Sequence, residues 1–240
     1  MVSIYYSWLM GKILLKEANA LVDIKGNLKK IEDTLLNGVL LCAVTKTHTP
    51  EEMNVAIDAG VTDIGENKVQ EILDKYDEVK PVRWHMIGHL QTNKVKYIID
   101  KVSLIHSVDS LKLAKEIDKR AKEHNKVMDI LIQVNSAEEE SKFGISTEEL
   151  EKMIETILES YDNICIRGLM CIAPYAENPD EVRKYFAEVK SLYDKFGKIE
   201  HERLDFKYLS MGMSNDYQVA MEEGSNLVRV GSAIFGRRTY

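Results

Sequence analysis

Two short segments near the C-terminus combine glycine and serine as anion-binding loops do. They are Ser210-Met-Gly-Met-Ser214 and Gly231-Ser232. Glycine lets the backbone approach an anion closely, serine adds a hydroxyl donor, and the N–H groups that open a helix point at the same ligand. One such loop would indicate only a turn. Two of them at neighbouring strand ends favour a phosphate site.

Lys46 is the second candidate for chemistry, because it directly follows the apolar segment 40–44 and Thr45. A lysine at a strand end is usually a solvated charge, and an amine with a pKa of about 10.4 is a weak nucleophile. Desolvation, or a neighbouring cation such as Arg229, would lower that pKa and free the amine to form an imine. The position of Lys46 alone leaves both roles open.

His85 and His89 have the spacing of a metal-binding pair on a helix. Their segment is predicted to be the end of a strand, where four residues span about 13 Å. We therefore expect no metal site, with His85 packed in the interior and His89 facing the mouth of the fold.

Strand-like and helix-like segments alternate from Val39 to the end of the chain, and they would position these residues. The strands are expected at 39–45, 62–64, 83–87, 104–107, 127–134, 164–169, 206–209 and 227–230. Capping boxes at Thr49–Glu52 and Ser146–Glu149 mark two of the intervening helices. Eight units without a long linker predict an α/β protein, a single (β/α)8 TIM barrel, with an open doubly wound sheet as the competing fold.

A further helix is expected before the first strand. Apolar residues recur at spacings of three and four from Leu14 to Leu35, and Asn37-Gly38 then supplies a stop. We expect residues 1–38 to form a helical extension and residues 39–240 to form the barrel, together making one structural domain.

Composition excludes several classes of protein. The chain is 45% hydrophobic and carries a net charge of −7, which argues against disorder and against a nucleic-acid or anionic-membrane partner. Its three cysteines lie in apolar segments without metal-site spacing, as buried thiols of a reducing compartment do. The apolar stretch 4–10 is too short to span a bilayer. A monomeric cytoplasmic protein is the expectation.

Several longer motifs resemble those of the pyridoxal phosphate homeostasis proteins. The matching segments are Ala43-Val-Thr-Lys46-Thr, Asp63-Ile-Gly-Glu-Asn67, Trp84-His-Met-Ile-Gly-His-Leu-Gln-Thr-Asn-Lys94, Gly168-Leu-Met170, Leu209-Ser-Met-Gly-Met-Ser214 and Val228-Arg-Val-Gly-Ser-Ala-Ile-Phe-Gly236. The resemblance covers nearly everything after the first helix. Thr45 stands where serine is expected, and the first 15 residues fit the family less well.

The resemblance implies a barrel related to the N-terminal domain of alanine racemase, with pyridoxal 5′-phosphate (PLP) bound as a Schiff base to Lys46. Three residues would hold the phosphate, Asn67 and Ser210 would line the site, and Arg229 would face the pyridine nitrogen or the phosphate. The phosphate-binding residues are Ser214, Gly231 and Ser232. No metal is implied.

The resemblance also implies a PLP-binding protein of intracellular cofactor homeostasis, without evident catalysis, that serves PLP-dependent apo-enzymes. An arginine beside the ring nitrogen would leave it unprotonated and weaken the ring as an electron sink. The chain also ends at Tyr240, just after the eighth strand, where a racemase would continue into a second domain. A racemase-like PLP enzyme and a cofactor-free Schiff-base aldolase are the alternatives.

Overall fold

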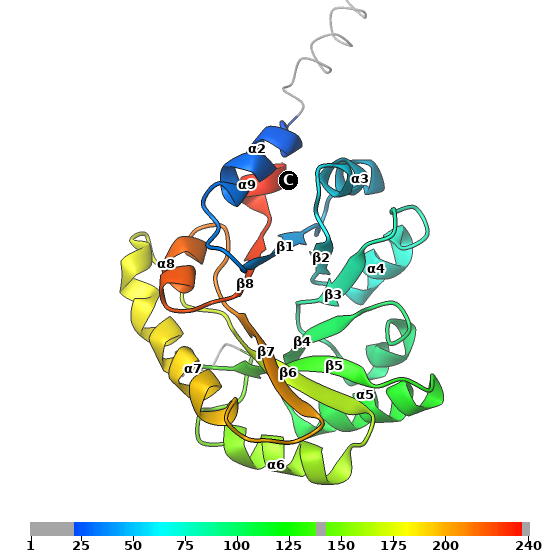
Figure 1. Cartoon of the computed structure of the whole chain (residues 1–240). Helices are drawn as coiled ribbons and strands as arrows, with labels where there is room; N and C mark the ends of the chain where they lie inside the picture. The colour runs from blue at the N-terminus through cyan, green and yellow to red at the C-terminus, as the bar shows by residue number, and fades with distance from the viewer. Residues whose placement is uncertain (1–21, 138–142, 237–240) are drawn as a thin grey trace, which may run out of the picture.

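The computed structural model describes residues 22–137 and 143–236, and it shows a closed barrel of parallel strands (Figure 1). Each strand pairs with the next along the chain, and β8 pairs with β1. The strands are β1 Leu40–Val44, β2 Asp63–Glu66, β3 Arg83–Met86, β4 Leu104–Val108, β5 Met128–Val134, β6 Ile164–Cys171, β7 Leu204–Ser210 and β8 Leu227–Val230. The predicted (β/α)8 barrel is confirmed, and the open sheet is wrong.

Helices surround the barrel on its outside (Figure 1). They are α2 Ile24–Glu32, α3 Pro50–Asp58, α4 Val69–Lys75, α5 Leu111–Glu123, α6 Leu150–Ser160, α7 Arg183–Phe196, α8 Tyr217–Glu222 and α9 Ser232–Phe235, with 3₁₀ turns η1 Thr92–Tyr97 and η2 Pro179–Val182. No helix in the described part of the chain is both long enough and apolar enough to cross a membrane.

The two predicted capping boxes have different outcomes. At the start of α3 the box forms as predicted, because the Thr49 side chain accepts from the Glu52 N–H and the Glu52 carboxylate accepts from the Thr49 N–H. Ser146 and Glu149 make the same pair of bonds, at 3.4 and 3.3 Å. That pair closes a turn, however, and α6 begins only at Leu150.

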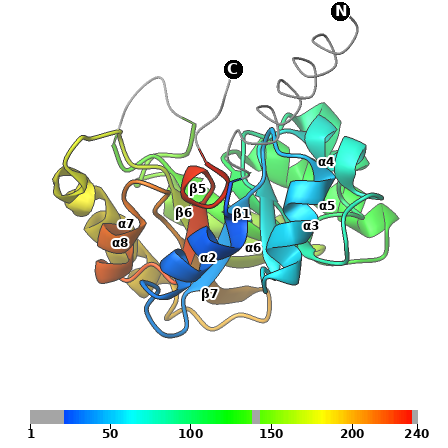
Figure 2. The same ribbon diagram turned by 90° about the horizontal axis from the view of Figure 1, so that it is seen from above.

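The helix before the first strand completes the outer layer. Its described part is α2, which buries Ile24, Leu28 and Ile31, while predicted residues 14–21 lie outside the described residues. The helix after β8, α9, is only four residues long. Figures 1 and 2 show α2 beside α9 and near α3, and Asn27 Nδ2 donates to the Ile234 carbonyl at 3.0 Å. Thus α2 covers the β8–β1 seam that the short last helix leaves open.

The buried apolar residues form an outer and an inner cluster. The outer one joins the strands to the helices, and the inner one fills the barrel. The inner cluster is Cys42, Val44, Ile87, Leu104, Leu131, Met170 and Leu227. As predicted, all three cysteines are buried and unpaired, and burial raises the pKa of Cys171 to about 12. Buried polar residues share the barrel interior with the inner cluster and lead to the candidate site.

Gly168 permits a close approach between β6 and β7. It pairs with Tyr208 where the register shifts, has a φ of +136°, and a Cβ added there would lie 1.9 Å from the Tyr208 carbonyl oxygen. We expect Gly168→Ala to lower the free energy of unfolding by at least about 2 kcal/mol, because it combines strain with a backbone clash. Urea denaturation measures this change.

Gly60→Ala is the matched control, since Gly60 has a φ of +112° and nothing within 4 Å of an added Cβ. Equal losses of stability in the two variants would show that the clash with the Tyr208 carbonyl adds nothing to the cost of backbone strain in Gly168→Ala.

Candidate functional site

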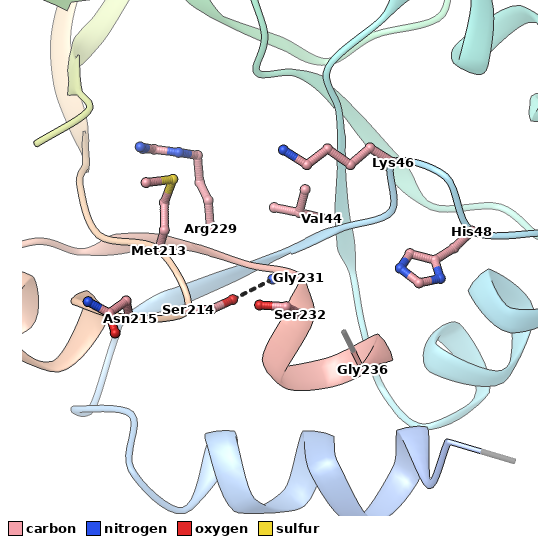
Figure 3. Close-up of a pocket in the computed structure, with 10 residues that line it drawn as sticks. All are labelled: Val44, Lys46, His48, Met213, Ser214, Asn215, Arg229, Gly231, Ser232 and Gly236. Carbon is pink, nitrogen blue, oxygen red and sulfur yellow. Dashed lines mark hydrogen bonds between the residues drawn. The ribbon is translucent and has the colours of Figure 1, made fainter. Parts of the chain in front are cut away.

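A cavity opens where β1, β7 and β8 end (Figure 3). It is lined by Val44, Lys46, His48, Met213, Ser214, Asn215, Arg229, Gly231, Ser232 and Gly236. Strand ends on one side of a barrel surround a common mouth, which is why residues so distant in sequence meet here. In Figure 3 the Lys46 amine extends toward Arg229, while the hydroxyls of Ser214 and Ser232 lie near Gly231.

Most of the residues predicted from sequence meet in this cavity, but two do not. Lys46, Ser214, Arg229 and the pair Gly231-Ser232 line it. Asn67 lines a neighbouring cavity with Lys68, His89 and Lys94. Ser210 does not line the cavity, because it is fully buried and its hydroxyl contacts Arg229. The ligand-binding roles of all of them remain predictions.

The end of β8 is shaped for an anion. The Gly231 N–H donates to Ser214 Oγ at 3.2 Å, so the loops after β7 and β8 are joined. A Cβ on Gly231 would lie 3.1 Å from both the Val44 carbonyl oxygen and the Val44 Cβ, which keeps this position small. Ser232 begins α9, and the first N–H groups of a helix have no acceptor within it. Backbone and hydroxyl donors therefore gather on one side of the cavity.

Arg229 is a buried cation, with only 3% of its surface exposed. Its Nη1 donates to the Ser210 carbonyl at 2.8 Å and to Ser210 Oγ at 2.6 Å, and its Nη2 donates to the Cys171 carbonyl at 2.9 Å. Burial lowers the pKa of Arg229, but an arginine starts so high that the guanidinium keeps its charge. The cavity therefore has a fixed positive charge in its wall.

A chain of hydrogen bonds leads from Arg229 through the interior of the barrel. Ser210 Oγ lies 3.0 Å from His106 Nδ1, and His106 Nε2 lies 3.0 Å from His85 Nδ1. His85 Nε2 then lies 3.0 Å from Asp63 Oδ1. Arg83 binds both oxygens of that carboxylate, at 2.8 and 2.6 Å. The cavity is thus connected to the opposite end of the barrel.

Arg229 determines how this chain begins. A guanidinium only donates, so Ser210 Oγ accepts from Arg229 and its own proton points to His106. His106 Nδ1 accepts this proton and its Nε2 faces His85 Nδ1, so the His106 ring is neutral. Burial, reinforced by the charge of Arg229, puts the pKa of His106 well below its usual range. Although burial opposes it, hydrogen bonds from His85 and Arg83 hold the pKa of Asp63 below its usual range.

We did not predict the roles of His106 and Asp63 from sequence. His106 is an ionisable residue in the largely apolar strand β4, and Asp63 is one of two carboxylates in β2, and those were the available signals. His85 is buried, as expected. The His89 ring stacks on Phe143 at 3.9 Å and its Nδ1 lies 3.3 Å from Asp109, so the two histidines have separate surroundings.

Comparison with known proteins gives matches over most of the chain. Residues 20–239 match the family model described as alanine racemase, N-terminal domain. A pyridoxal phosphate homeostasis protein of Aquifex aeolicus is 46% identical over 206 residues, covering 85% of this chain and 89% of that protein. One from Helicobacter pylori is 38% identical over 200 residues, with 82% and 87% covered.

Solved structures agree with these relatives. PipY of Synechococcus elongatus, solved with PLP bound, superposes with a TM-score of 0.81 at 32% identity, covering 89% of this chain and all of that one. Alanine racemase of Clostridium difficile has a TM-score of 0.68 at 15% identity, with 91% of this chain and 60% of that chain covered. At that identity the racemase shares the fold alone.

The neutral His106 makes stability depend on pH. A histidine has a pKa of about 6.5 in an unfolded chain, so below that pH the unfolded state binds a proton that the folded state does not. The stabilisation is therefore present above about pH 6.5 and is lost as the pH falls. Between about pH 6.5 and 5 we expect the unfolding free energy to fall more steeply in the wild type than in His106→Gln. The difference between the two slopes should be up to about 1.4 kcal/mol per pH unit.

Urea denaturation at several pH values measures these slopes. His124→Gln, at the exposed end of α5, controls for replacing a histidine by glutamine. Parallel slopes for the wild type and His106→Gln would refute a neutral His106.

Proposed function

This chain belongs to the family of pyridoxal phosphate homeostasis proteins, built on the alanine racemase N-terminal domain, and from that premise we propose that it binds PLP between Lys46 and the loops after β7 and β8. The observation that carries the proposal is the single cavity that holds an amine, a buried guanidinium and two serine hydroxyls (Figure 3). The PLP bound to PipY, at 32% identity, supports the choice of ligand.

The residues present suit the three functional parts of PLP. The Lys46 amine suits the aldehyde. The hydroxyls of Ser214 and Ser232, with the opening N–H groups of α9, suit the phosphate. Arg229 is held by protein acceptors on both terminal nitrogens, so its remaining N–H groups suit the pyridine nitrogen or a phosphate oxygen.

We further propose that Lys46 holds the cofactor as a Schiff base. In that step Lys46 Nζ forms a C=N bond with the aldehyde carbon, and the carbonyl oxygen leaves as water with both amine hydrogens. Lys46 must supply a neutral amine, while Ser214 and Ser232 orient the ligand through its phosphate. The proposed PLP site uses Ser214, Gly231 and Ser232 from the last two loops.

We propose a carrier rather than an enzyme because of Arg229. A guanidinium does not give up its proton, so it leaves a facing ring nitrogen unprotonated and withholds the electron sink that carbanion chemistry needs. The chain of hydrogen bonds from Ser210 to Asp63 holds Arg229 in place. The atom of this chain that Arg229 contacts is a hydroxyl oxygen and not a carboxylate. In this proposal the chain acts as a monomer in the cytoplasm and releases PLP to apo-enzymes.

Replacing Lys46 tests the covalent link. We expect wild-type protein incubated with PLP to be yellow, and borohydride to fix a pyridoxyl phosphate mass on Lys46, because reduction makes the C–N bond permanent. Lys46→Ala should abolish both signals, while Lys68→Ala, in the neighbouring cavity, should keep them.

A colourless wild type that takes up no PLP would contradict the proposal. Exchange of the α-proton of free amino acids, dependent on Lys46, would favour the racemase-like alternative. A borohydride adduct that forms only with a separate carbonyl substrate would favour the aldolase.

The phosphate loops give a second test. We expect Ser232→Ala and Ser214→Ala each to raise the Kd for PLP about tenfold, because each removes a hydrogen bond to a charged group worth roughly 1.5 kcal/mol. Binding of pyridoxal, which has no phosphate, should be unchanged and is the control in an equilibrium titration. An equal loss for both ligands would mean that the serines do not contact the phosphate.

A further inference from the structure

A buried ionic cluster lies behind the segment that carries Lys46. Lys75 Nζ on α4 is 2.9 Å from Glu66 Oε1 on β2 and 2.8 Å from Glu71 Oε2. The three side chains are 11%, 0% and 19% exposed, respectively. Exposed ion pairs stabilise a fold very little, whereas buried charges must be matched by good geometry. We call these three residues the α4 cluster.

The α4 cluster holds the residue before Lys46. Thr45 Oγ1 donates to Glu66 Oε1 at 2.7 Å, and Lys75 Nζ donates to the Thr45 carbonyl at 3.2 Å. The Thr45 N–H already donates to the Gly65 carbonyl of β2 at 3.0 Å. The side chain and both backbone polar groups of Thr45 are therefore bonded.

The same cluster holds the residue after Lys46. The Thr47 N–H donates to Glu71 Oε2 at 2.6 Å, a charge-assisted bond. Thr47 has a φ of +69°, a left-handed conformation that a β-branched residue rarely adopts. Such a conformation persists only where its surroundings impose it. Glu71 supplies a side-chain bond to this turn, which the His48 N–H also closes by donating to the Thr45 carbonyl at 3.1 Å.

Strand alternation separates the cluster from the cavity. Successive side chains of a strand point to opposite faces. Thr45 contacts the helix side of β1, through Glu66 and α4, whereas Val44 and Lys46 line the cavity. The cluster therefore bonds to the backbone on either side of Lys46 from the helix side of β1.

Attachment of α4 to the barrel does not require these charges. Val69 and Ile72 already anchor the helix in the outer apolar cluster. Apolar contacts are not directional, however, and they cannot fix a carbonyl and an N–H two residues apart. The charged groups supply these two directional bonds. Glu66 also keeps one carboxylate oxygen, Oε2, buried without a hydrogen-bond partner in the described structure, so its placement is costly.

We propose that Glu66, Glu71 and Lys75 are positioning residues for Lys46, which clamp the backbone at Thr45 and Thr47 so that the amine is aimed at the ligand before it binds. The proposal rests on the proposed PLP site and deepens it. The step that depends on this orientation of the amine is the formation of the bond between Lys46 Nζ and the aldehyde carbon, with the release of one water. The affinity of the loops after β7 and β8 for the phosphate of PLP does not depend on the orientation of Lys46.

Glu71→Ala and Glu71→Gln test the clamp, because glutamine keeps an acceptor for the Thr47 N–H and alanine does not. We expect hydrogen exchange at the Thr47 amide of the cofactor-free protein to be at least about tenfold faster in Glu71→Ala. The rate of covalent attachment of PLP, measured by stopped-flow absorbance, should be roughly ten- to a hundredfold lower in Glu71→Ala than in the wild type. Glu71→Gln should recover most of both.

Two controls separate positioning from general loss of structure. Glu116→Ala breaks a similar i,i+4 pair with Arg120 on α5, far from Lys46 in the chain, and should leave both rates unchanged. Pyridoxine 5′-phosphate carries a hydroxymethyl group in place of the aldehyde, so it binds without covalent attachment. Its Kd should be the same for the wild type and both Glu71 variants.

The outcomes distinguish this inference from the proposed function. Fast attachment in wild type with an unchanged rate in Glu71→Ala would overturn the clamp and leave the PLP site standing. A parallel rise in the Kd for pyridoxine 5′-phosphate would overturn it as well, since the cluster would then support the whole cavity. Absence of any attachment in the wild type would instead refute the proposed function.

Discussion

The charge of Arg229 is the constraint on which the rest of the site depends. A guanidinium buried in a barrel is tolerated only when acceptors surround it, because an unpaired charge in a low-dielectric interior is very unfavourable. Carbonyl groups of β6 and β7 and the Ser210 hydroxyl supply these acceptors. Ser210 then needs an acceptor of its own, and the chain continues through two histidines to Asp63.

This need explains the mixed interior of the barrel. The inner apolar cluster fills part of the space between the strands, while the polar chain from Arg229 to Asp63 crosses the rest. At the far end the Asp63 charge meets Arg83, whose side chain is 55% exposed. One buried positive charge at the cavity is thereby linked, through a chain of hydrogen bonds, to an ion pair at the other end of the barrel.

Local sequence patterns predicted the barrel and much of the cavity, because strand periodicity and capping boxes are local properties. Residues at strand ends converge in any barrel, so their positions alone predicted that Lys46, Ser214 and Gly231 lie at one mouth. The features that the sequence did not predict depend on contacts between residues far apart in the chain. The Ser210 hydroxyl is bonded to Arg229 inside the barrel, and the N–H of the left-handed Thr47 is bonded to a glutamate 24 residues away.

The guanidinium and the amine of the cavity are supported from opposite sides. Arg229 is held from inside the barrel by the Ser210–His106–His85 chain, whereas the backbone of Lys46 is held from the helix layer by α4. Thr45 faces the helices and Cys42 belongs to the inner cluster, so β1 lies between the two networks. Mutations more than about 7–10 Å apart that share no partners usually have additive effects. The proposed recognition of PLP by its phosphate and ring and its proposed capture by the Lys46 amine should therefore change independently of each other.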